Sequence, residues 1–522
     1  MPLPPVTGPP SFCDDGAVPP GTITKPQRLG RVIELSRSGA KITRMACRAT
    51  VGSSQSSPAG LILVVLLVIA GCASSTTTAA PSAAGSPTSA IPGWTFPPAP
   101  IAPEGPLEPG VGAALDTLVT SLLAGAFDDA ALETIAASED PRLGWFLSDL
   151  LRFMQGSTRQ DALTDALRRL MGVDPRDDPT FAASPWRSVT DVLIAWDLPA
   201  WPGYREIKAR IFVDVEPGWE AFFADKDAAI DWRHVSWGGV LIDDRPLGDT
   251  ASCVRGCIPA LDDPALIPAT EGGWYPDERI VFGLAIGGDE VALPRNIMEI
   301  HEMVNMTIGG RRLGIPYCTL CGSAQAYFTD AVPADVNVPV LRTSGLLSRS
   351  NKVMYDLETR SVLDTFTGEA LSGPLQDVGV VLEQVTVVVT TWGEWKAAHP
   401  ATRIVARDGG IGRTYPEDPL GGRDDDGPIF PIGDVDPRLP VQANIIGVIS
   451  PDGSPVAFPA DQARAVLAQG GDVEFGDIEV TSDGGGLRVK VRGGDELPAH
   501  QAFWFAWSQF HPDTVVWTPL TR

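Results

Sequence analysis

A short apolar run near the N-terminus decides which part of this chain can fold as a domain. Residues 61–70 are apolar, basic residues that include Lys41 and Arg48 precede them, and Gly71-Cys72-Ala73 follows directly. The run is too short to cross a bilayer, which needs roughly twenty apolar residues. A basic flank, a short apolar core and an exit of small residues are the parts of a secretory signal. We therefore expect residues 1–72 to direct export and to take no part in the fold.

The residues at the end of this run predict a lipid anchor. The tetrad Ile69-Ala70-Gly71-Cys72 resembles the bacterial lipobox, in which the cysteine thiol receives a diacylglycerol and becomes the mature N-terminus. Ile69 stands where that pattern prefers Leu. A plain cleavable signal and a buried core strand are the alternatives. The interpretation predicts an extracytoplasmic lipoprotein, attached to the membrane through lipid on Cys72.

The segment that follows predicts a flexible tether. Residues 73–110 consist almost entirely of Ser, Thr, Ala, Pro and Gly. Such a composition buries too little apolar surface to offset the entropy of ordering. The remaining chain is long enough for two or three domains.

The charge balance bears on possible partners. The chain has 40 Lys and Arg residues against 65 Asp and Glu, a formal net charge of -25. Nucleic-acid binding depends on clustered Lys and Arg that neutralise phosphates, and the sequence contains no such cluster. We expect no nucleic-acid partner and attribute the acidity to solubility at a surface.

The hydrophobic pattern changes once along the chain. Leu115, Leu118, Val119, Leu122 and Leu123 form one apolar stripe of a helix. Further helices are predicted at 130–137, 141–154 and 159–171. From about residue 231 the pattern turns to short apolar runs and alternation, which predict strands at 280–286, 312–317, 385–390 and 444–449. Helices are rarer there, at 294–305, 392–398 and 460–468.

This change predicts an α+β chain in two parts. A helical domain spans 111–230, and a β-dominated mixed domain spans 231–522. The helical part is expected to form a bundle or a solenoid-like cap, and it is a candidate surface for a protein partner.

Four cysteines follow Cys72, and two of them form the most informative motif. Cys318-Thr319-Leu320-Cys321-Gly322 brings two sulfurs to one point, and the glycine permits the positive φ that turns backbone N–H groups toward thiolates. The same spacing is typical of a redox-active dithiol, in which one thiolate attacks and the other resolves. A structural disulfide, or two small buried residues, is the third interpretation. The metal interpretation predicts zinc or copper.

His301 and Glu302 are accessory candidates just upstream of this motif. On the predicted helix 294–305, His301 and Asn305 lie four residues apart on one face. The segment lacks the second histidine of a zinc-protease helix, so that mechanism is not supported. His301 remains the best histidine candidate for a ligand or base, with Glu302 a weaker ligand candidate. The alternative is a histidine that is merely hydrogen-bonded in a core.

Cys253 and Cys257 form a second pair. They are weaker candidates for the missing ligands of a four-thiolate zinc site, and they could equally close their own disulfide. In an exported chain we favour the disulfide.

Six blocks of the sequence together resemble the bacterial domain of unknown function numbered 3179. They are CIPALDDP at 257–264, HEMVN at 301–305, YCTLCG at 317–322, SGLL at 344–347 with NKVMYD at 351–356, TWGEWK at 391–396, and FWFAWSQFHPDT at 503–514. The resemblance covers roughly 232–514 and implies an exported or lipid-anchored protein, without implying a reaction. Four positions depart from the family pattern, namely Cys257, Leu293, Met306 and Thr319.

Two classes of function follow from the sequence. The first is a metal-binding or thiol-redox protein centred on Cys318 and Cys321. The second is a non-enzymatic surface module whose helical part binds a partner protein. A hydrolase or small-molecule binder is a weaker third possibility, because sequence order alone does not assemble a nucleophile, a base and an oxyanion donor. Trp392, Trp395, Trp504 and Trp507 are expected to be core residues.

Overall fold

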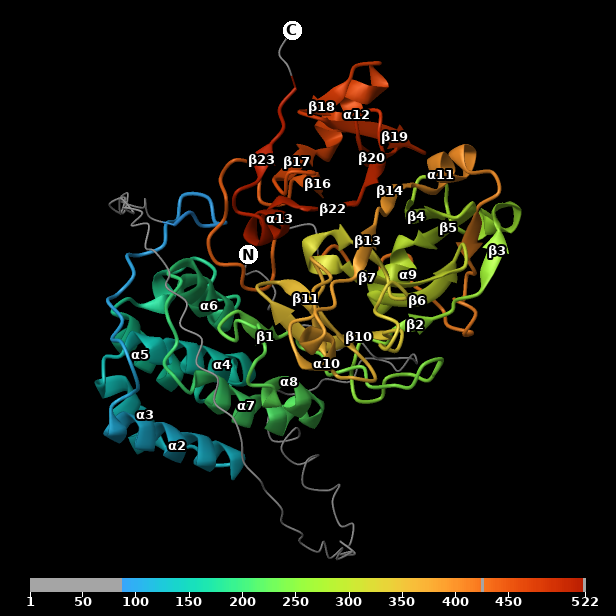
Figure 1. The fold of residues 1–522 in the computed structure, drawn as a ribbon. Helices are drawn as coiled ribbons and strands as arrows, with labels where there is room; N and C mark the ends of the chain where they lie inside the picture. The colour runs from blue at the N-terminus through green and yellow to red at the C-terminus, as the bar shows by residue number, and fades with distance from the viewer. Residues whose placement is uncertain (1–86, 424–426, 520–522) are drawn as a thin grey trace, which may run out of the picture.

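The computed structural model describes residues 87–423 and 427–519, and its N-terminal part is helical (Figure 1). Cys72 and the signal segment lie outside the described residues. The predicted helices at 130–137, 141–154 and 159–171 are present, the second as a 3-10 turn at Pro141–Leu143 that continues into a helix. The helices are α2 (Pro109–Leu123), α3 (Asp129–Ala137), α4 (Gly144–Met154), α5 (Gln160–Met171), α6 (Pro185–Ala195), α7 (Tyr204–Val215) and α8 (Glu220–Ala224).

Local chemistry sets the ends of these helices. The Asp128 side chain accepts a hydrogen bond from the backbone N–H of Ala131 and so caps α3. Asp140 does the same for the 3-10 turn that precedes α4. Helix α5 ends at Gly172, whose φ of 70° lies in the left-handed region that glycine adopts without strain. The apolar stripe of α2 is buried at Leu115, Leu118 and Val119.

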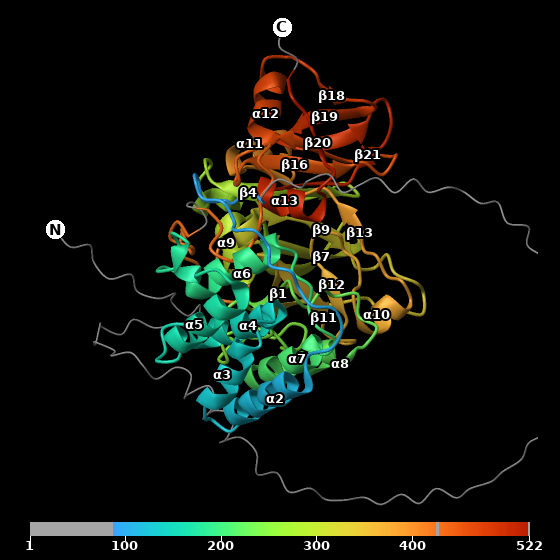
Figure 2. The same ribbon diagram turned by 90° about the vertical axis from the view of Figure 1, so that its left-hand side faces the viewer.

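The prediction of a tether through residue 110 is wrong for its second half. Figure 2 shows the segment from residue 87 running from the C-terminal sheets down to the helices. Phe96 is buried, the Trp196 indole donates to the carbonyl of Pro97 at 2.6 Å, and Arg142 donates to the carbonyl of Gly105 at 2.6 Å. A few aromatic and backbone contacts therefore order a segment whose composition is otherwise that of a linker.

Beyond the helices the described residues form five sheets, and the α+β prediction is confirmed. The first has the order β1 (Val235–Trp237), β10 (Leu341–Ser348), β11 (Asn351–Asp356) and β12 (Val362–Asp364). The second has the order β13 (Glu383–Val385), β9 (Ala326–Phe328), β7 (Arg311–Cys318), β6 (Met303–Ile308) and β2 (Leu261–Asp262), with β8 (Ser323–Ala324) paired to β7.

The third and fourth sheets share one topology with each other. One runs β14 (Val388–Thr391), β4 (Ile280–Ile286), β5 (Asp289–Pro294), β15 (Arg403–Val405), with β3 (Leu266–Pro268) added at its edge. The other runs β22 (Ala499–Phe503), β16 (Asn444–Ile449), β17 (Pro455–Pro459), β23 (Val515–Val516). In each, the last of the four strands pairs in parallel with the third and the other pairs are antiparallel. The fifth sheet has the order β18 (Val473–Phe475), β19 (Ile478–Asp483), β20 (Gly486–Val491), β21 (Glu496–Leu497).

Short helices connect these sheets. They are α9 (Arg295–His301), α10 (Gly373–Asp377), α11 (Trp392–Ala398), α12 (Ala460–Ala468) and α13 (Trp504–Phe510). The predicted strand 385–390 is two strands, β13 and β14, interrupted at residues 386–387. The predicted helix 294–305 is also wrong in its second half. It ends at His301, because Glu302 adopts the left-handed conformation (φ 51°), and Asn305 lies on β6.

The two matching sheets reveal an internal repeat. In each, a helix of sequence Trp-x-x-Trp-x-x-x-His-Pro follows the first strand in the sheet order, as α11 and α13. The Trp395 indole donates to the Thr402 hydroxyl at 2.9 Å, and the Trp507 indole donates to the Thr514 hydroxyl at 2.8 Å. A side chain at Gly283 would meet the ring of Trp395, and one at Gly447 would meet the ring of Trp507, each within about 2.5 Å. The expectation that these tryptophans are core residues is confirmed.

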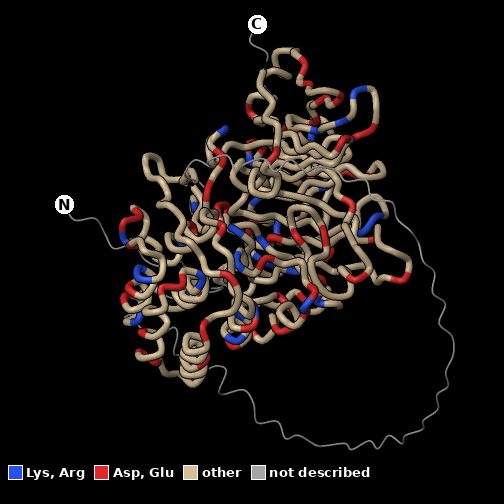
Figure 3. Tube along the Cα trace, turned by 60° about the vertical axis from the view of Figure 1, so that its left-hand side comes forward, with Lys and Arg blue, Asp and Glu red and all other residues tan. Residues whose placement is uncertain are grey.

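The helical part and the first sheet share one hydrophobic core. Trp219 and Phe222 pack with Val235, Leu346 and Tyr355 of β1, β10 and β11. The Trp219 indole also donates to the carbonyl of Ser344 at 2.7 Å. In the described part of the chain, Lys and Arg are interspersed with Asp and Glu along the trace (Figure 3).

A buried carboxylate also joins the helical part to the loop that precedes β16. Asp191 on α6 accepts hydrogen bonds from the backbone N–H groups of Ile432 and Gly433, both at 2.7 Å, and lies 3.4 Å from Arg187. Burial raises the pKa of Asp191 to about 6, although Arg187 and the two N–H groups favour the charged form.

The stability of the protein should therefore depend on pH through Asp191. The folded-state pKa of Asp191 lies above the ordinary value of 3.8, so the folded protein binds this proton more tightly than the unfolded chain does. The free energy of unfolding therefore falls as pH rises from about 4 to about 6. The shift corresponds to about 3 kcal/mol. We expect Asp191→Asn, which keeps an acceptor oxygen but does not titrate, to lose this decline in urea unfolding between these pH values. The matched change Asp129→Asn, in an exposed ion pair with Arg159, should leave the decline in place. A decline that persists in Asp191→Asn would contradict the assignment.

Candidate functional site: a buried dithiol beside an ion pair

The hairpin of β6 and β7 brings Glu302 to the cysteine motif. The backbone N–H of Tyr317 donates to the carbonyl of Glu302 at 3.0 Å, because β6 begins directly after Glu302 and pairs with β7 in an antiparallel register. The Thr319 hydroxyl donates to the Glu302 carboxylate at 3.0 Å. Glu302, which the sequence made the weaker candidate, is therefore the residue that contacts the motif.

The cysteine motif is a tight turn between two strands. Strand β7 ends at Cys318, a 3-10 turn spans Thr319–Cys321, and Gly322 follows with a φ of 58°. Both cysteines are free thiols, and both are buried. Their sulfurs share one neighbour, the carbonyl oxygen of Ser350, at 3.8 Å from Cys318 Sγ and 3.5 Å from Cys321 Sγ.

Ser350 reaches the thiols because of a strained hairpin turn. It lies between β10 and β11, where Arg349 and Ser350 both adopt left-handed φ values of 49° and 54°. Non-glycine residues rarely adopt this conformation and do so at a cost in free energy. The surrounding structure must hold the turn, which fixes the Ser350 carbonyl over the sulfurs.

Lys352, two positions after Ser350, provides a buried cation. It is 4% exposed, and its ammonium lies 3.7 Å from the Glu302 carboxylate. The ammonium also donates to the carbonyl of Glu302 and, at 3.4 Å, to the carbonyl of Tyr317. Burial lowers the pKa of Lys352 and raises the pKa of Glu302, while the attraction between the two groups opposes both shifts.

The two thiols have opposite acidities. Burial and the nearby Glu302 carboxylate oppose ionisation of Cys318, but a hydrogen bond from Cys321, together with the backbone N–H and the ammonium of Lys352, outweighs them and lowers the pKa of Cys318. Burial and the neighbouring Cys318 sulfur raise the pKa of Cys321 well above its ordinary value. The arrangement can hold a thiolate on Cys318 and a protonated thiol on Cys321.

A small cavity of about 60 Å³ lies against this cluster. Glu302, Thr319 and Lys352 line it on one side, and the remaining wall is mainly apolar, with one further cation. That wall comprises Gly238, Val240, Ile258, Leu320, Thr343, Gly345, Leu346, Leu347, Leu420, Arg423 and Phe430. The cavity volume is that of a few small atoms or water molecules.

His301 faces away from this cluster. Its Nδ1 lies 2.6 Å from the carbonyl of Pro259, which can only accept, so Nδ1 carries the proton and Nε2 accepts from the Tyr415 hydroxyl at 2.7 Å. Burial lowers the pKa of His301 to about 3, which keeps the ring neutral. His301 lines a separate polar cavity of about 310 Å³ together with Arg245, Asp262 and Arg413. Both ring nitrogens are occupied, as in the core-histidine alternative. Asn305 also lies elsewhere, bonded to Asp262 and to the backbone of Leu341.

The predicted disulfide between Cys253 and Cys257 is confirmed. Because these sulfurs are bonded to each other, the alternative of a four-thiolate zinc site is not formed. Within residues 87–423 and 427–519, no three His, Cys, Asp or Glu side chains converge in a way that could hold a metal ion.

Sequence reasoning missed Lys352 and Ser350. Lys352 stands in one of the family blocks, in the run Asn351-Lys352-Val353-Met354-Tyr355, where every residue of the strand is buried. A lysine directly before the apolar and aromatic run Val353-Met354-Tyr355 was the available signal, since buried lysines are rare unless paired.

The fold and the site define an α+β protein in which two matching sheets each pack a tryptophan against a glycine, and in which a buried dithiol lies beside a Glu–Lys ion pair. Residues 255–487 match the model of a family described as proteins of unknown function, DUF3179, which is the family that the six sequence blocks resemble. No curated protein and no solved structure matches the chain. Among the described residues, no helix has both the length and the apolar character required to cross a membrane.

The ion pair should stabilise the site only as a pair. We expect Lys352→Met to lower the free energy of unfolding by about 3 to 5 kcal/mol, because it leaves the buried Glu302 carboxylate without its cation. Adding Glu302→Gln should recover part of this loss, so that the double variant is more stable than the sum of the single effects. Urea unfolding of the four proteins in a double-mutant cycle measures the coupling. Additive losses would show that the two groups do not interact.

Proposed function

We propose that the protein is an exported thiol-redox protein in which Cys318 and Cys321 cycle between a dithiol and a disulfide. The observation that carries this proposal is the pair of free thiols in one tight turn, which share the Ser350 carbonyl as a neighbour and lie beside the buried Lys352–Glu302 pair. The lowered pKa of Cys318 and the raised pKa of Cys321 agree with it. A nearby cation stabilises a reactive thiolate, whereas two structural thiols do not need one.

Each residue of the cluster has a role in this reaction. The Cys318 thiolate attacks a sulfur of a substrate disulfide, forms a mixed disulfide and releases one substrate thiolate. Cys321 then gives up its proton and attacks the Cys318 sulfur, which closes the Cys318–Cys321 disulfide and releases the second substrate thiolate. One substrate disulfide is reduced and two protein thiols are oxidised. The Lys352 ammonium lowers the energy of the Cys318 thiolate, and Glu302 holds that ammonium in place.

The reactivity of individual cysteines tests this proposal. In the full chain, graded thiol–disulfide buffers followed by alkylation and peptide mass spectrometry should show Cys318 and Cys321 oxidising together and reversibly. In Cys321→Ser, Cys318 should form a stable mixed disulfide, and in Cys318→Ser the adduct on Cys321 should form at least about tenfold more slowly. Metal analysis of the same preparations tests the metal interpretation.

Two results would reject the redox proposal. The first is a pair of thiols that stay reduced across all buffers in the folded protein. The second is stoichiometric zinc or copper that protects both thiols from oxidation and is lost on Cys318→Ser, which would favour a metal site instead. If neither redox activity nor metal is found, the non-enzymatic surface module is the better interpretation.

We also propose that the protein is held at the outer face of a membrane by lipid on Cys72. The support is the signal-like run at 61–70 and the lipobox-like tetrad that ends it. The compartment matters for the chemistry, because disulfides persist in oxidising spaces and are rare in the cytosol. The helical part remains a candidate surface for a protein partner.

Lipid attachment can be tested in bacterial cells. We expect the wild-type chain to incorporate labelled fatty acid and to fractionate with membranes, and Cys72→Ser to do neither. Cys47→Ser is the matched control, since it removes a thiol that precedes the apolar run and should leave both results unchanged. Unlabelled wild-type protein in the cytosolic fraction would overturn the proposal.

A further inference from the structure

The Cys253–Cys257 disulfide closes a very small loop at the surface. Its cysteines are four positions apart in the chain, and the loop between them carries Val254, which is 95% exposed. A disulfide stabilises a fold mainly by closing a loop of the unfolded chain, and short loops gain least. This bond also joins no two distant parts of the structure. It is therefore poorly placed to act as a structural staple.

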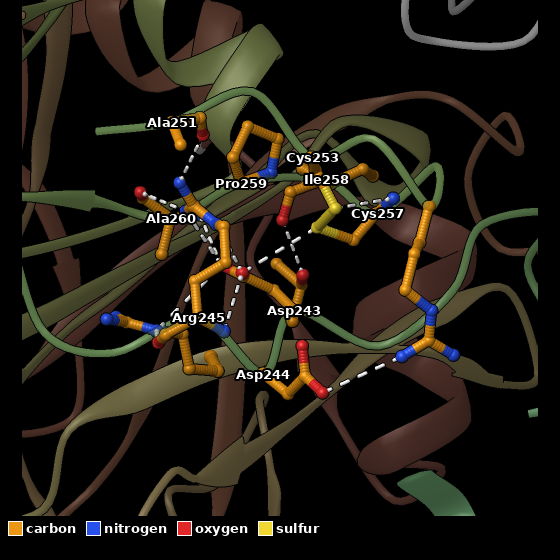
Figure 4. The surroundings of a disulfide bond; sticks show 12 residues. Asp243, Asp244, Arg245, Ala251, Cys253, Cys257, Ile258, Pro259 and Ala260 are labelled. Atoms are coloured by element: carbon orange, nitrogen blue, oxygen red, sulfur yellow. Dashed lines mark hydrogen bonds and ion pairs between the residues drawn. A yellow bond between two sulfur atoms is a disulfide. The ribbon is translucent and has the colours of Figure 1, made fainter. Parts of the chain in front are cut away.

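The loop is held in place by contacts that do not involve the sulfurs. Figure 4 shows Arg245 beside Ala251 and Ala260, which lie in the segments that lead into and out of the disulfide loop. Its guanidinium donates to the Asp243 carboxylate at 2.6 Å and to the carbonyls of Asp249, Ala251 and Ala260 at 2.9 to 3.0 Å.

The segment between the two cysteines is anchored as well. Arg255 donates to both carboxylate oxygens of the buried Glu216 at 2.8 Å. The backbone N–H of Leu241 donates to the carbonyl of Gly256 at 3.0 Å. The same backbone can therefore keep the two sulfurs close whether or not they are bonded.

The two sulfurs have different surroundings. The backbone N–H of Cys257 donates to Cys253 Sγ at 3.0 Å, which favours negative charge on Cys253. Cys257 Sγ lies 3.6 Å from the Asp243 carboxylate, which disfavours negative charge on Cys257. Cys253 is also the more exposed of the two, at 7% against 1%. An external thiol therefore meets Cys253 first.

From this geometry we infer that Cys253 and Cys257 form a second redox-active couple, which exchanges with low-molecular-weight thiols through Cys253. A thiolate RS⁻ attacks Cys253 Sγ, the bond between the two cysteines breaks, and a Cys253–S–SR mixed disulfide forms as Cys257 leaves and takes up a proton. A second RS⁻ attacks the RS sulfur, which releases RSSR and leaves Cys253 as a thiolate. Two electrons pass from two thiols to the protein disulfide. This inference does not depend on the proposed activity of Cys318 and Cys321.

Glutathione is the probe for the test, with the full chain and peptide-level detection. We expect reduced glutathione to open the Cys253–Cys257 bond in the folded protein, with near-UV circular dichroism unchanged and a melting temperature lowered by less than about 4 °C. Oxidised glutathione should close it again. In Cys257→Ser the glutathione adduct should accumulate on Cys253, and in Cys253→Ser the adduct on Cys257 should form at least about tenfold more slowly.

The matched variants separate a redox couple from a staple. Cys253→Ala/Cys257→Ala should fold with nearly wild-type stability, because Arg245 and Arg255 hold the loop. A bond that resists glutathione in the folded protein, or that opens only as the fold is lost, would overturn the inference, and so would equal adduct formation at the two cysteines. Parallel detection of the Cys318–Cys321 peptide keeps this outcome distinct from that of the other pair.

Discussion

The contact between an indole ring and a glycine of a neighbouring strand underlies the β-rich part of this protein. Trp395 lies over Gly283 and Trp507 over Gly447, at positions where any side chain would collide with the ring. Each indole is then fixed by a threonine hydroxyl seven residues later in the chain. The two copies build sheets of the same strand order, so this scaffold is one packing solution used twice.

The repeat separates scaffold from site. The Trp, His, Pro and Thr positions occur in both copies and are explained by packing. The cysteine turn, Ser350 and Lys352 lie in the segment between β5 and β14, which is much longer than the segment between the matching strands β17 and β22 of the second copy. The residues of the candidate site are therefore additions to the repeated scaffold. This placement supports the proposal that Cys318 and Cys321 carry the function. His511 belongs to the repeated motif, so we interpret it as a structural residue.

The added segment packs against the helical part on one side and against the second copy of the repeat on the other. Its first sheet shares a core with the helical part, and its cysteine turn packs in the same cluster as Trp504 and Trp507 of the second copy. Closure on both sides explains the burial of the thiols and of the Glu302–Lys352 pair. A buried ion pair is costly unless its partners are held in good geometry, and here two backbone carbonyls complete the coordination of the ammonium. Burial by itself raises the pKa of both thiols, and the hydrogen bond between them and the nearby Lys352 separate their acidities.

The sequence by itself determined the α+β class and the helices and strands that have a clear apolar period, because these depend on local periodicity and turn chemistry. It favoured a disulfide between Cys253 and Cys257, and its short motifs resemble the family whose model residues 255–487 match. Strands 280–286 and 444–449 are predicted to the residue, whereas helix 294–305 is cut at His301 by the left-handed Glu302. Only the tertiary structure decided the partners of the cysteine turn. It placed Glu302 and Lys352, 50 positions apart in the chain, against Cys318 and Thr319, and it turned His301 toward Tyr415, 114 positions away. Such pairings depend on which strands and loops pack together, and no local pattern of residues records that choice.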